Sequence, residues 1–246
     1  MMCSCKSIQC NIRSLNLGLQ RVCFCVDGEW ILNESLKQSI TEYISTTTSQ
    51  LQHNAYDKIP LKFDGWDKAM FEKSAIRVVP GAIVRYGSFF ENDVVLMNCF
   101  VNIGAYIGST TMIDSFATIG SCAQIGKKCH ISSNVVIGGV LEPVNALPVI
   151  IEDNCFIGAN SSVVEGVLVR HGSTIAMGTH IGASTKIIDR ETGQIFYKEI
   201  PCNAVVVPGT YQSNNGIAIH CAVIVRYGKT NTEINEKLRK QHDYYE

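Results

Sequence analysis

Bulky apolar residues recur every six positions through the middle of the chain, in two blocks that are out of phase with each other. An α-helix has a period of 3.6 residues and cannot keep such residues on one face, whereas short strands joined by tight corners can. We therefore expect each hexad to form one flat side of a three-sided coil of roughly 18 residues, with its bulky apolar residue pointing inward. The predicted inward residues are Ile83, Phe89, Val95, Val101, Ile107, Ile113, Ile119, Ile125, Ile131 and Ile137, then Ile151, Ile157, Val163, Val169, Ile175, Ile181 and Ile187.

The remaining positions of the hexad also favour a parallel β-helix. Glycine often follows the apolar residue, where a corner brings backbones close together, and the fourth residue after it is mostly small. The seventeen hexads correspond to between five and six coils. The two blocks are separated by a proline-containing segment that we predict to be an excursion loop near residues 142–149, and loops that leave a rigid scaffold often carry a functional site.

The flanking segments predict smaller elements around this β-helix. We expect a helix over residues 34–44 with Asn33 as its N-cap, strands over 204–207 and 222–226, and a terminal helix over 232–240. The predicted organisation is a small N-terminal α/β cap domain (1–76), the β-helix (77–200) and a C-terminal strand and helix extension (201–246).

The charge balance argues against two classes of partner. The 246 residues include 21 Lys and Arg against 22 Asp and Glu, so no basic surface is available for nucleic acid or for an anionic membrane. No window approaches the roughly 20 apolar residues of a membrane span. The apolar stretch 22–26 is shorter than the roughly 7 to 15 residues of a secretory signal core. We therefore predict a cytoplasmic protein.

The cysteines and histidines do not form a metal motif. None of the eleven cysteines belongs to a C-x-x-C pair, which excludes a zinc ribbon or a thioredoxin-type site. Several occupy small positions of the hexad, so we interpret them as buried small residues in a reducing compartment. Only His171 and His180 are near each other in the sequence, and their spacing does not match the ligand pair of a zinc-dependent hydratase. No metal site is predicted.

A β-helix of uniform width has flat sides and few pockets, so we expect its sites between neighbouring subunits, most simply in a trimer. Acyl transfer from a thioester to an amine needs a group that takes the amine proton and N–H donors for the oxyanion. His130, His171 and His180 are candidates for the base by residue type alone, although each is expected to be a solvated outward side chain. Asp114 is another candidate, because it follows an inward isoleucine at a position where the hexads before and after it have glycine.

Several segments contain more than generic hexads and carry a family resemblance. They are VNIGAY (101–106), MIDSFATIGSCAQIGK (112–127), IGGVLEP (137–143), IIEDNCFIGA (150–159) and STKIIDRETG (184–193), with YDKIPLKF (56–63) before them and HCAVIV (220–225) after them. Over roughly residues 20–240 the chain resembles the tetrahydrodipicolinate N-succinyltransferases, a family of hexapeptide-repeat acyltransferases. The resemblance implies that the β-helix is left-handed.

The resemblance also implies an activity. Such an enzyme moves a succinyl group from succinyl-CoA, a co-substrate, to the amino group of ring-opened tetrahydrodipicolinate in diaminopimelate and lysine biosynthesis. It works as a cytoplasmic homotrimer with intersubunit sites and no permanently bound cofactor. Arg77 and Asp114 match the family's substrate-binding positions, and Asp114 would bind or deprotonate the amine. CoA would lie in the intersubunit groove, with Gly139, Lys186 and Arg190 as candidates for lining it.

The chain departs from the family pattern at two positions. Ser162 stands where the family has a glutamate proposed as catalytic, so Asp114 alone, Glu165 or Glu142 would carry the proton transfer. Phe116 replaces a tryptophan and keeps an aromatic wall. Three alternatives therefore remain open: a related CoA-dependent N-acetyltransferase, a catalytically weakened structural trimer, and a packing solenoid without chemistry.

Overall fold

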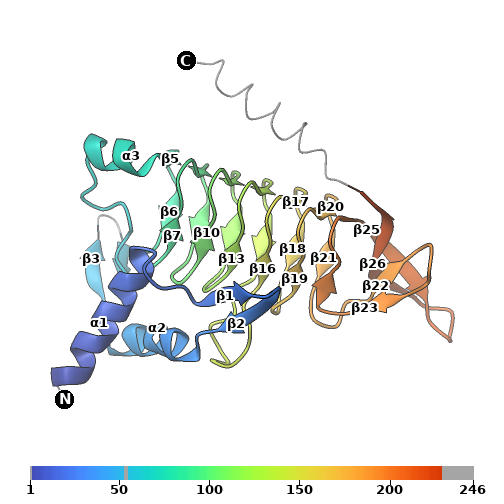
Figure 1. Cartoon of the computed structure of the whole chain (residues 1–246), viewed down its shortest axis with the longest axis horizontal. Helices are drawn as coiled ribbons and strands as arrows, with labels where there is room; N and C mark the ends of the chain where they lie inside the picture. The colour runs from blue at the N-terminus through green and yellow to red at the C-terminus, as the bar shows by residue number, and fades with distance from the viewer. Residues whose placement is uncertain (1, 53–54, 229–246) are drawn as a thin grey trace.

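The centre of the molecule is a parallel β-helix with a triangular cross-section (Figure 1). The computed structural model describes residues 2–52 and 55–228. Short strands lie on three faces, and each pairs in parallel with the strands one coil before and one coil after it. Six complete coils are present within the described residues.

We number the three faces in the order in which the chain crosses them. The first face contains β5 (Arg77–Val78), β8 (Val95–Leu96), β11 (Met112–Ile113), β14 (His130–Ile131), β17 (Phe156–Ile157), β20 (Thr174–Ile175) and β25 (Ala204–Gln212). The second face contains β6 (Ile83–Val84), β9 (Phe100–Val101), β12 (Thr118–Ile119), β15 (Val136–Ile137), β18 (Ser162–Val163) and β21 (His180–Ile181). The third face contains β7 (Phe89–Phe90), β10 (Tyr106–Ile107), β13 (Gln124–Ile125), β16 (Ile150–Ile151), β19 (Leu168–Val169) and β24 (Glu199–Ile200).

The second residue of nearly every two-residue strand points inward, and these residues form the core of the prism. The predicted inward positions are confirmed from Val101 to Ile181, all of which are buried. The prediction is wrong for the first three hexads, since Ile83 is 50% exposed. The inward residues there are Val84, Phe90 and Leu96. Both residues of each of these three strands are apolar, so the periodicity could not show which of the two faces inward. The connection from Leu96 to Val101 is one residue shorter than those between the preceding inward residues, and this shifts the phase of the repeat.

The chain leaves the prism once more after the excursion loop. Ile187 opens β22 (Ile187–Asp189), which pairs with β23 (Ile195–Phe196) and β26 (Ala218–Tyr227) instead of stacking on the third face. Ile200 of β24 takes the place on that face. The predicted strands 204–207 and 222–226 are confirmed as parts of the antiparallel pair β25–β26, whereas the helix expected over 232–240 lies outside the described residues.

The N-terminal segment contains three helices and two hairpins. They are α1 (Met2–Asn16), β1 (Cys23–Val26), β2 (Glu29–Leu32), α2 (Glu34–Thr46), β3 (Gln50–Gln52), β4 (Ala55–Asp57) and α3 (Lys68–Ser74). The helix expected over 34–44 is confirmed, and the Asn33 side chain accepts the N–H of Leu36 at 3.1 Å as its N-cap. Helix α1 was not predicted. The division into three domains stays a prediction.

The N-terminal segment covers one side of the prism. Ile12 of α1 and Ile40 of α2 pack in a second apolar cluster against Ile103 and Cys122 of the β-helix. The β1–β2 hairpin lies over the third face, where Arg21 Nε donates to Gln124 Oε1 at 2.6 Å. On the second face, Ile83 and Val136 remain exposed.

The prediction that the cysteines are buried is only partly correct. All nine whose side chains the structure describes carry free thiols. Burial is confirmed for Cys23, Cys99, Cys122, Cys129, Cys155 and Cys221 and is wrong for Cys10, Cys25 and Cys202.

Candidate functional site

Asp114 lies at the edge where the chain turns from the first face to the second. Its Oδ1 accepts the backbone N–H of Ser115 at 2.7 Å, and its Oδ2 lies 3.8 Å from Nε2 of His130. His130 belongs to the next coil of the first face, where its ring packs edge-on against Phe156 with the centroids 5.4 Å apart. The His130 side chain is only 16% exposed, so the expectation of a solvated side chain is wrong for this histidine. The edge thus presents a fixed carboxylate beside an imidazole.

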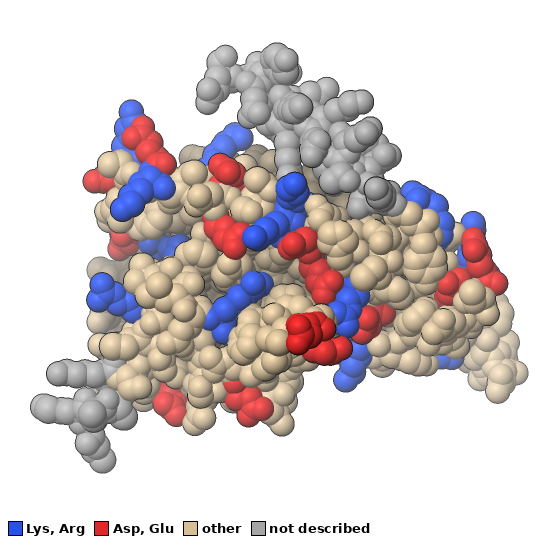
Figure 2. Space-filling model, viewed as in Figure 1, with Lys and Arg blue, Asp and Glu red and all other residues tan. Residues whose placement is uncertain are grey.

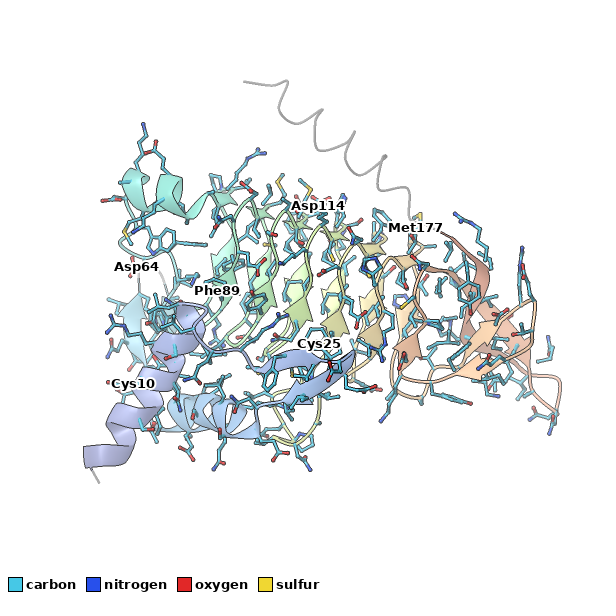
Figure 3. The ribbon with its side chains drawn as sticks, viewed as in Figure 1. Cys10, Cys25, Asp64, Phe89, Asp114 and Met177 are labelled. Carbon is cyan, nitrogen blue, oxygen red and sulfur yellow. The ribbon has the colours of Figure 1, made fainter. Side chains whose placement is uncertain are left out.

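Two large apolar side chains are exposed along the same edge. Phe116 is 66% exposed and Met177 is 67% exposed. Figure 3 shows Asp114 and Met177 on the side of the prism opposite the β1–β2 hairpin. Arg77 opens the first strand of the first face, two coils before Asp114, and is exposed. The structure therefore brings Arg77 and Asp114 to one side of the prism at a separation of roughly 10 Å along its axis, but not into contact.

Glu165 lies at a different edge, where the chain turns from the second face to the third. Its Oε2 accepts the backbone N–H of Ala183 at 2.8 Å, which ties two successive corners together. Glu165 and Gly139 both line a groove of about 500 Å³ beneath the excursion loop. Because Asp114 and Glu165 occupy different edges, one chain does not bring these two carboxylates together.

The excursion loop is held in place by the N-terminal segment. Lys37 of α2 is buried, and its Nζ donates to the carbonyl oxygens of Pro143 at 2.9 Å and Ala146 at 2.6 Å. Burial lowers the pKa of Lys37. Glu142, an alternative base in the sequence analysis, lines the same groove and is exposed.

The other two residues predicted to line the CoA groove lie further along the prism. Gly182 lies at the same edge as Gly139, two coils further along, and Lys186 follows it in the sequence. The Nζ of Lys186 lies 3.9 Å from the centroid of the Tyr211 ring. Arg190 is exposed at the end of β22, where its backbone N–H donates to the carbonyl oxygen of Ile224 at 3.1 Å. Gly139 and Lys186 thus lie near one edge, whereas Arg190 lies beyond it, on the sheet that β22 forms with β26.

A cluster that the sequence analysis missed lies on the second face. Ser162 and His180 are register partners in adjacent coils, and Ser162 Oγ lies 2.9 Å from His180 Nδ1. His220 of β26 continues the row, with its Nε2 2.8 Å from the backbone oxygen of His180 and its ring 6.3 Å from the His180 ring. We call Ser162, His180 and His220 the His180 cluster. The 18-residue spacing of Ser162 and His180 equals one coil, so the period could have revealed their contact.

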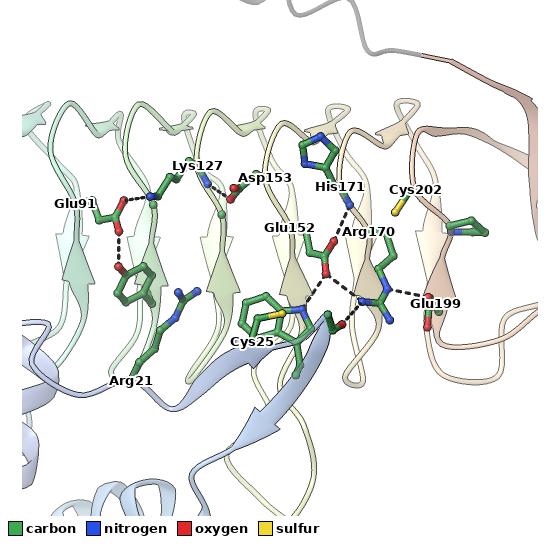
Figure 4. A pocket seen from close by; sticks show the side chains of 16 residues that line it. Arg21, Cys25, Glu91, Lys127, Glu152, Asp153, Arg170, His171, Glu199 and Cys202 are labelled. Carbon is green, nitrogen blue, oxygen red and sulfur yellow. Dashed lines mark hydrogen bonds and ion pairs between the residues drawn. The ribbon is translucent and has the colours of Figure 1, made fainter.

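A cavity lies between the β1–β2 hairpin and the edge joining the third and first faces (Figure 4). Its volume is about 680 Å³, and of the residues named in the sequence analysis as candidates for catalysis or binding only His171 lines it. Its charged groups pair with each other, since Arg170 bonds to Glu152 at 3.2 Å and to Glu199 at 2.8 Å. Trp30 Nε1 donates to Glu152 at 2.9 Å, so this network fastens the hairpin to the prism.

Neither metal ligation nor surface charge suggests another chemistry. Within residues 2–52 and 55–228, no group of three or more His, Cys, Asp or Glu side chains is placed to hold a metal ion. Basic and acidic side chains are interspersed over the face shown in Figure 2. None of the described helices is long and apolar enough to cross a membrane.

Comparison with known proteins places this arrangement in a family. Residues 148–183 match the hexapeptide repeat of succinyl-transferase, and residues 104–139 match the bacterial transferase hexapeptide of six repeats. A 2,3,4,5-tetrahydropyridine-2,6-dicarboxylate N-succinyltransferase from Wolbachia sp. subsp. Brugia malayi is 55% identical over 87% of this chain and 81% of the relative. The chain belongs to the tetrahydropyridine-dicarboxylate N-succinyltransferase family.

Further comparisons agree with this membership and with the fold. The N-succinyltransferase of the same name from Acinetobacter baylyi is 46% identical over 93% of this chain and 87% of its own length. A crystal structure from Campylobacter jejuni, described as a candidate 2,3,4,5-tetrahydropyridine-2-carboxylate N-succinyltransferase, superposes with a TM-score of 0.59 at 16% identity. The match covers 89% of this chain and 62% of that chain, and it confirms the left-handed parallel β-helix.

Proposed function

We propose that this N-succinyltransferase family member transfers a succinyl group from succinyl-CoA to the amino group of ring-opened tetrahydropyridine-2,6-dicarboxylate. This reaction serves diaminopimelate and lysine biosynthesis. The observation that carries the proposal is the 55% identity to a relative of that name over 87% of the chain. The amine nitrogen attacks the thioester carbon, the C–N bond forms, the C–S bond breaks, and the CoA thiolate leaves with a proton.

Arg77 and Asp114 are the proposed substrate-binding residues. The acceptor carries two carboxylates, and a guanidinium binds a carboxylate through two parallel hydrogen bonds. Arg77 is exposed and makes no ion pair within the described residues. Asp114 would hold the ammonium group and accept its proton, with Glu165 as the second candidate for proton transfer. The exposed ring of Phe116, two residues from Asp114, would form an apolar wall of the site.

The proposed assembly is a homotrimer whose sites lie between subunits. Asp114 and Glu165 occupy different edges of one prism, so a neighbouring prism is needed for both to meet one substrate. Ile83 and Val136 are exposed apolar residues on the second face, which suits contact with another subunit. CoA would lie in the groove between subunits, beside Gly139, Lys186 and Arg190. We also propose the cytoplasm as the location, because free thiols suit a reducing compartment.

The test uses the purified full chain with succinyl-CoA and the acceptor analogue 2-aminopimelate. Product is followed by mass spectrometry, because the cysteines would react with a thiol-detecting dye. Succinylated product is expected, and Asp114→Asn should lower kcat by about 10²- to 10⁴-fold, the usual contribution of a positioned acid or base. Asp93→Asn is the matched control, since Asp93 is an exposed turn residue at positive φ, where asparagine is tolerated.

Acetyl-CoA in a parallel reaction distinguishes the related N-acetyltransferase. If neither donor gives product while light scattering shows a folded trimer, the protein is not an acyltransferase for this acceptor. A monomer in the same measurement would refute the intersubunit site.

A further inference from the structure

The His180 cluster is a group of polar side chains at the outer surface of the last coils of the second face. Ser162 is partly exposed, and His180 and His220 are exposed. Hydrogen bonding gives the cluster a fixed arrangement, because Ser162 Oγ lies 2.9 Å from Nδ1 of His180 and His220 Nε2 lies 2.8 Å from the His180 backbone oxygen. Nε2 of His180 takes part in neither of these hydrogen bonds.

The surroundings of the cluster favour an anion. Within the described residues, neither His180 nor His220 forms an ion pair with a carboxylate. The ammonium of Lys186 lies against the Tyr211 ring, on the strand β25 that pairs with the β26 segment carrying His220. Glu165, at the neighbouring edge, already accepts the N–H of Ala183. An exposed set of hydroxyl and imidazole groups beside a lysine is suited to receive a carboxylate.

The height of the cluster along the prism suggests which carboxylate it receives. Ser162 lies two coils and His180 three coils beyond the coil that starts at Asp114. Two coils span about 10 Å and three span about 14 Å, and the 2.9 Å contact between His180 Nδ1 and Ser162 Oγ places the His180 ring close to the lower of these two levels. The acceptor amine is hydrogen-bonded to Asp114 while it attacks the thioester carbon of succinyl-CoA. Along the extended succinyl chain, the group that hydrogen-bonds the free carboxylate then lies about 11 Å from Asp114. A threefold axis parallel to the prism leaves these heights unchanged, so the match holds between subunits as well as within one.

We propose that Ser162, His180 and His220 form the subsite for the free carboxylate of the succinyl chain and thereby select succinyl-CoA over acetyl-CoA. The Ser162 hydroxyl donates to Nδ1 of His180 and so keeps the proton on Nε2, which donates to the carboxylate. His220 holds the backbone of His180 in place. The proposal rests on the proposed function and adds the determinant of acyl-donor choice.

The test compares kcat/KM for succinyl-CoA and acetyl-CoA with 2-aminopimelate as acceptor. His180→Phe keeps a planar ring but removes the donor, so the succinyl/acetyl ratio should fall by about tenfold to a hundredfold, with activity on acetyl-CoA retained. His180→Gln places an amide N–H₂ near the position of Nε2 and should restore part of the ratio. Ser162→Ala should lower the ratio by a smaller factor, because the tautomer of His180 is no longer held.

His171→Phe is the matched control, because His171 is an exposed histidine at the edge between the third and first faces. It should leave the ratio unchanged. An unchanged ratio in His180→Phe overturns the proposal while the proposed function stands. An equal loss with both donors also overturns it and assigns the cluster to the phosphates of CoA. If the wild-type protein acylates 2-aminopimelate with neither donor, the proposed function fails and the subsite fails with it.

Discussion

Lys62 makes the stability of this protein depend on pH in a direction that can be calculated. Its side chain is only 7% exposed, and its Nζ donates to Asn16 O and Asn16 Oδ1 at 2.9 Å each and to Ser88 O at 2.8 Å. All three acceptors are neutral, so burial dominates and lowers the pKa of Lys62 from 10.5 to about 7. These bonds join the end of α1 to the first coil.

The unfolded chain therefore binds more protons at this lysine than the folded chain between pH 7 and pH 10.5. The free energy of unfolding rises with pH wherever the unfolded state binds more protons, at up to about 1.4 kcal/mol per pH unit for one group. From pH 7, where folded Lys62 is half protonated, to pH 9 the gain is about 2 kcal/mol. The gain is lost as the pH falls back toward 7.

The measurement is urea unfolding followed by circular dichroism at pH 7, 8 and 9, for the wild type and for Lys62→Met at one protein concentration. Methionine keeps the apolar stem and does not titrate, and the acceptors it leaves unpaired impose a penalty that does not depend on pH. The stability of the wild type relative to Lys62→Met should increase by about 2 kcal/mol between pH 7 and 9. A difference that stays constant over this range would refute a desolvated charge at Lys62.

Three further substitutions test the packing around the prism. Ile131→Ala removes a fully buried inward residue and should cost about 2–5 kcal/mol of unfolding free energy, measured by urea titration; a cost below about 1 kcal/mol would contradict the stacked core. Gly120→Ala would place a Cβ 2.1 Å from the backbone nitrogen of Gly139, so we expect a loss of about 1–3 kcal/mol and a lower melting temperature, whereas an unchanged melting temperature would contradict this close approach. Lys37→Met removes both hydrogen bonds to the excursion loop, so limited proteolysis should cut within residues 142–147 faster than in the wild type, and an equal cutting rate would show that the loop is held by other contacts.

The candidate site was only partly predictable, because the sequence indicates which residues are unusual but not which side chains meet. Asp114 was identifiable because a carboxylate interrupts a run of corner glycines. Its contact with His130 was not identified, although the two residues occupy successive coils of one face. The same holds for Ser162 and His180. The Ser162–His180 pair follows from the coil length once the period is known, whereas His130 is the register partner of Met112 and contacts Asp114 diagonally. His220 reaches the cluster from β26, which lies outside the repeat.

Periodicity alone determined the β-helix, the inward residues from Val101 to Ile181 and the place of the excursion loop. In a stacked repeat, each residue lies above the residue one coil earlier in the sequence. The local sequence and its period are therefore sufficient to predict which residues stack. Only the tertiary structure decided which of two adjacent apolar residues faces inward in the first coils, since Ile83 and Val84 satisfy the pattern equally. It also decided that the β1–β2 hairpin of the N-terminal segment lies over the third face. Contacts such as Trp30 with Glu152 join residues 122 positions apart, and no period relates them. They depend on complementary shape and hydrogen bonding between two separately formed surfaces.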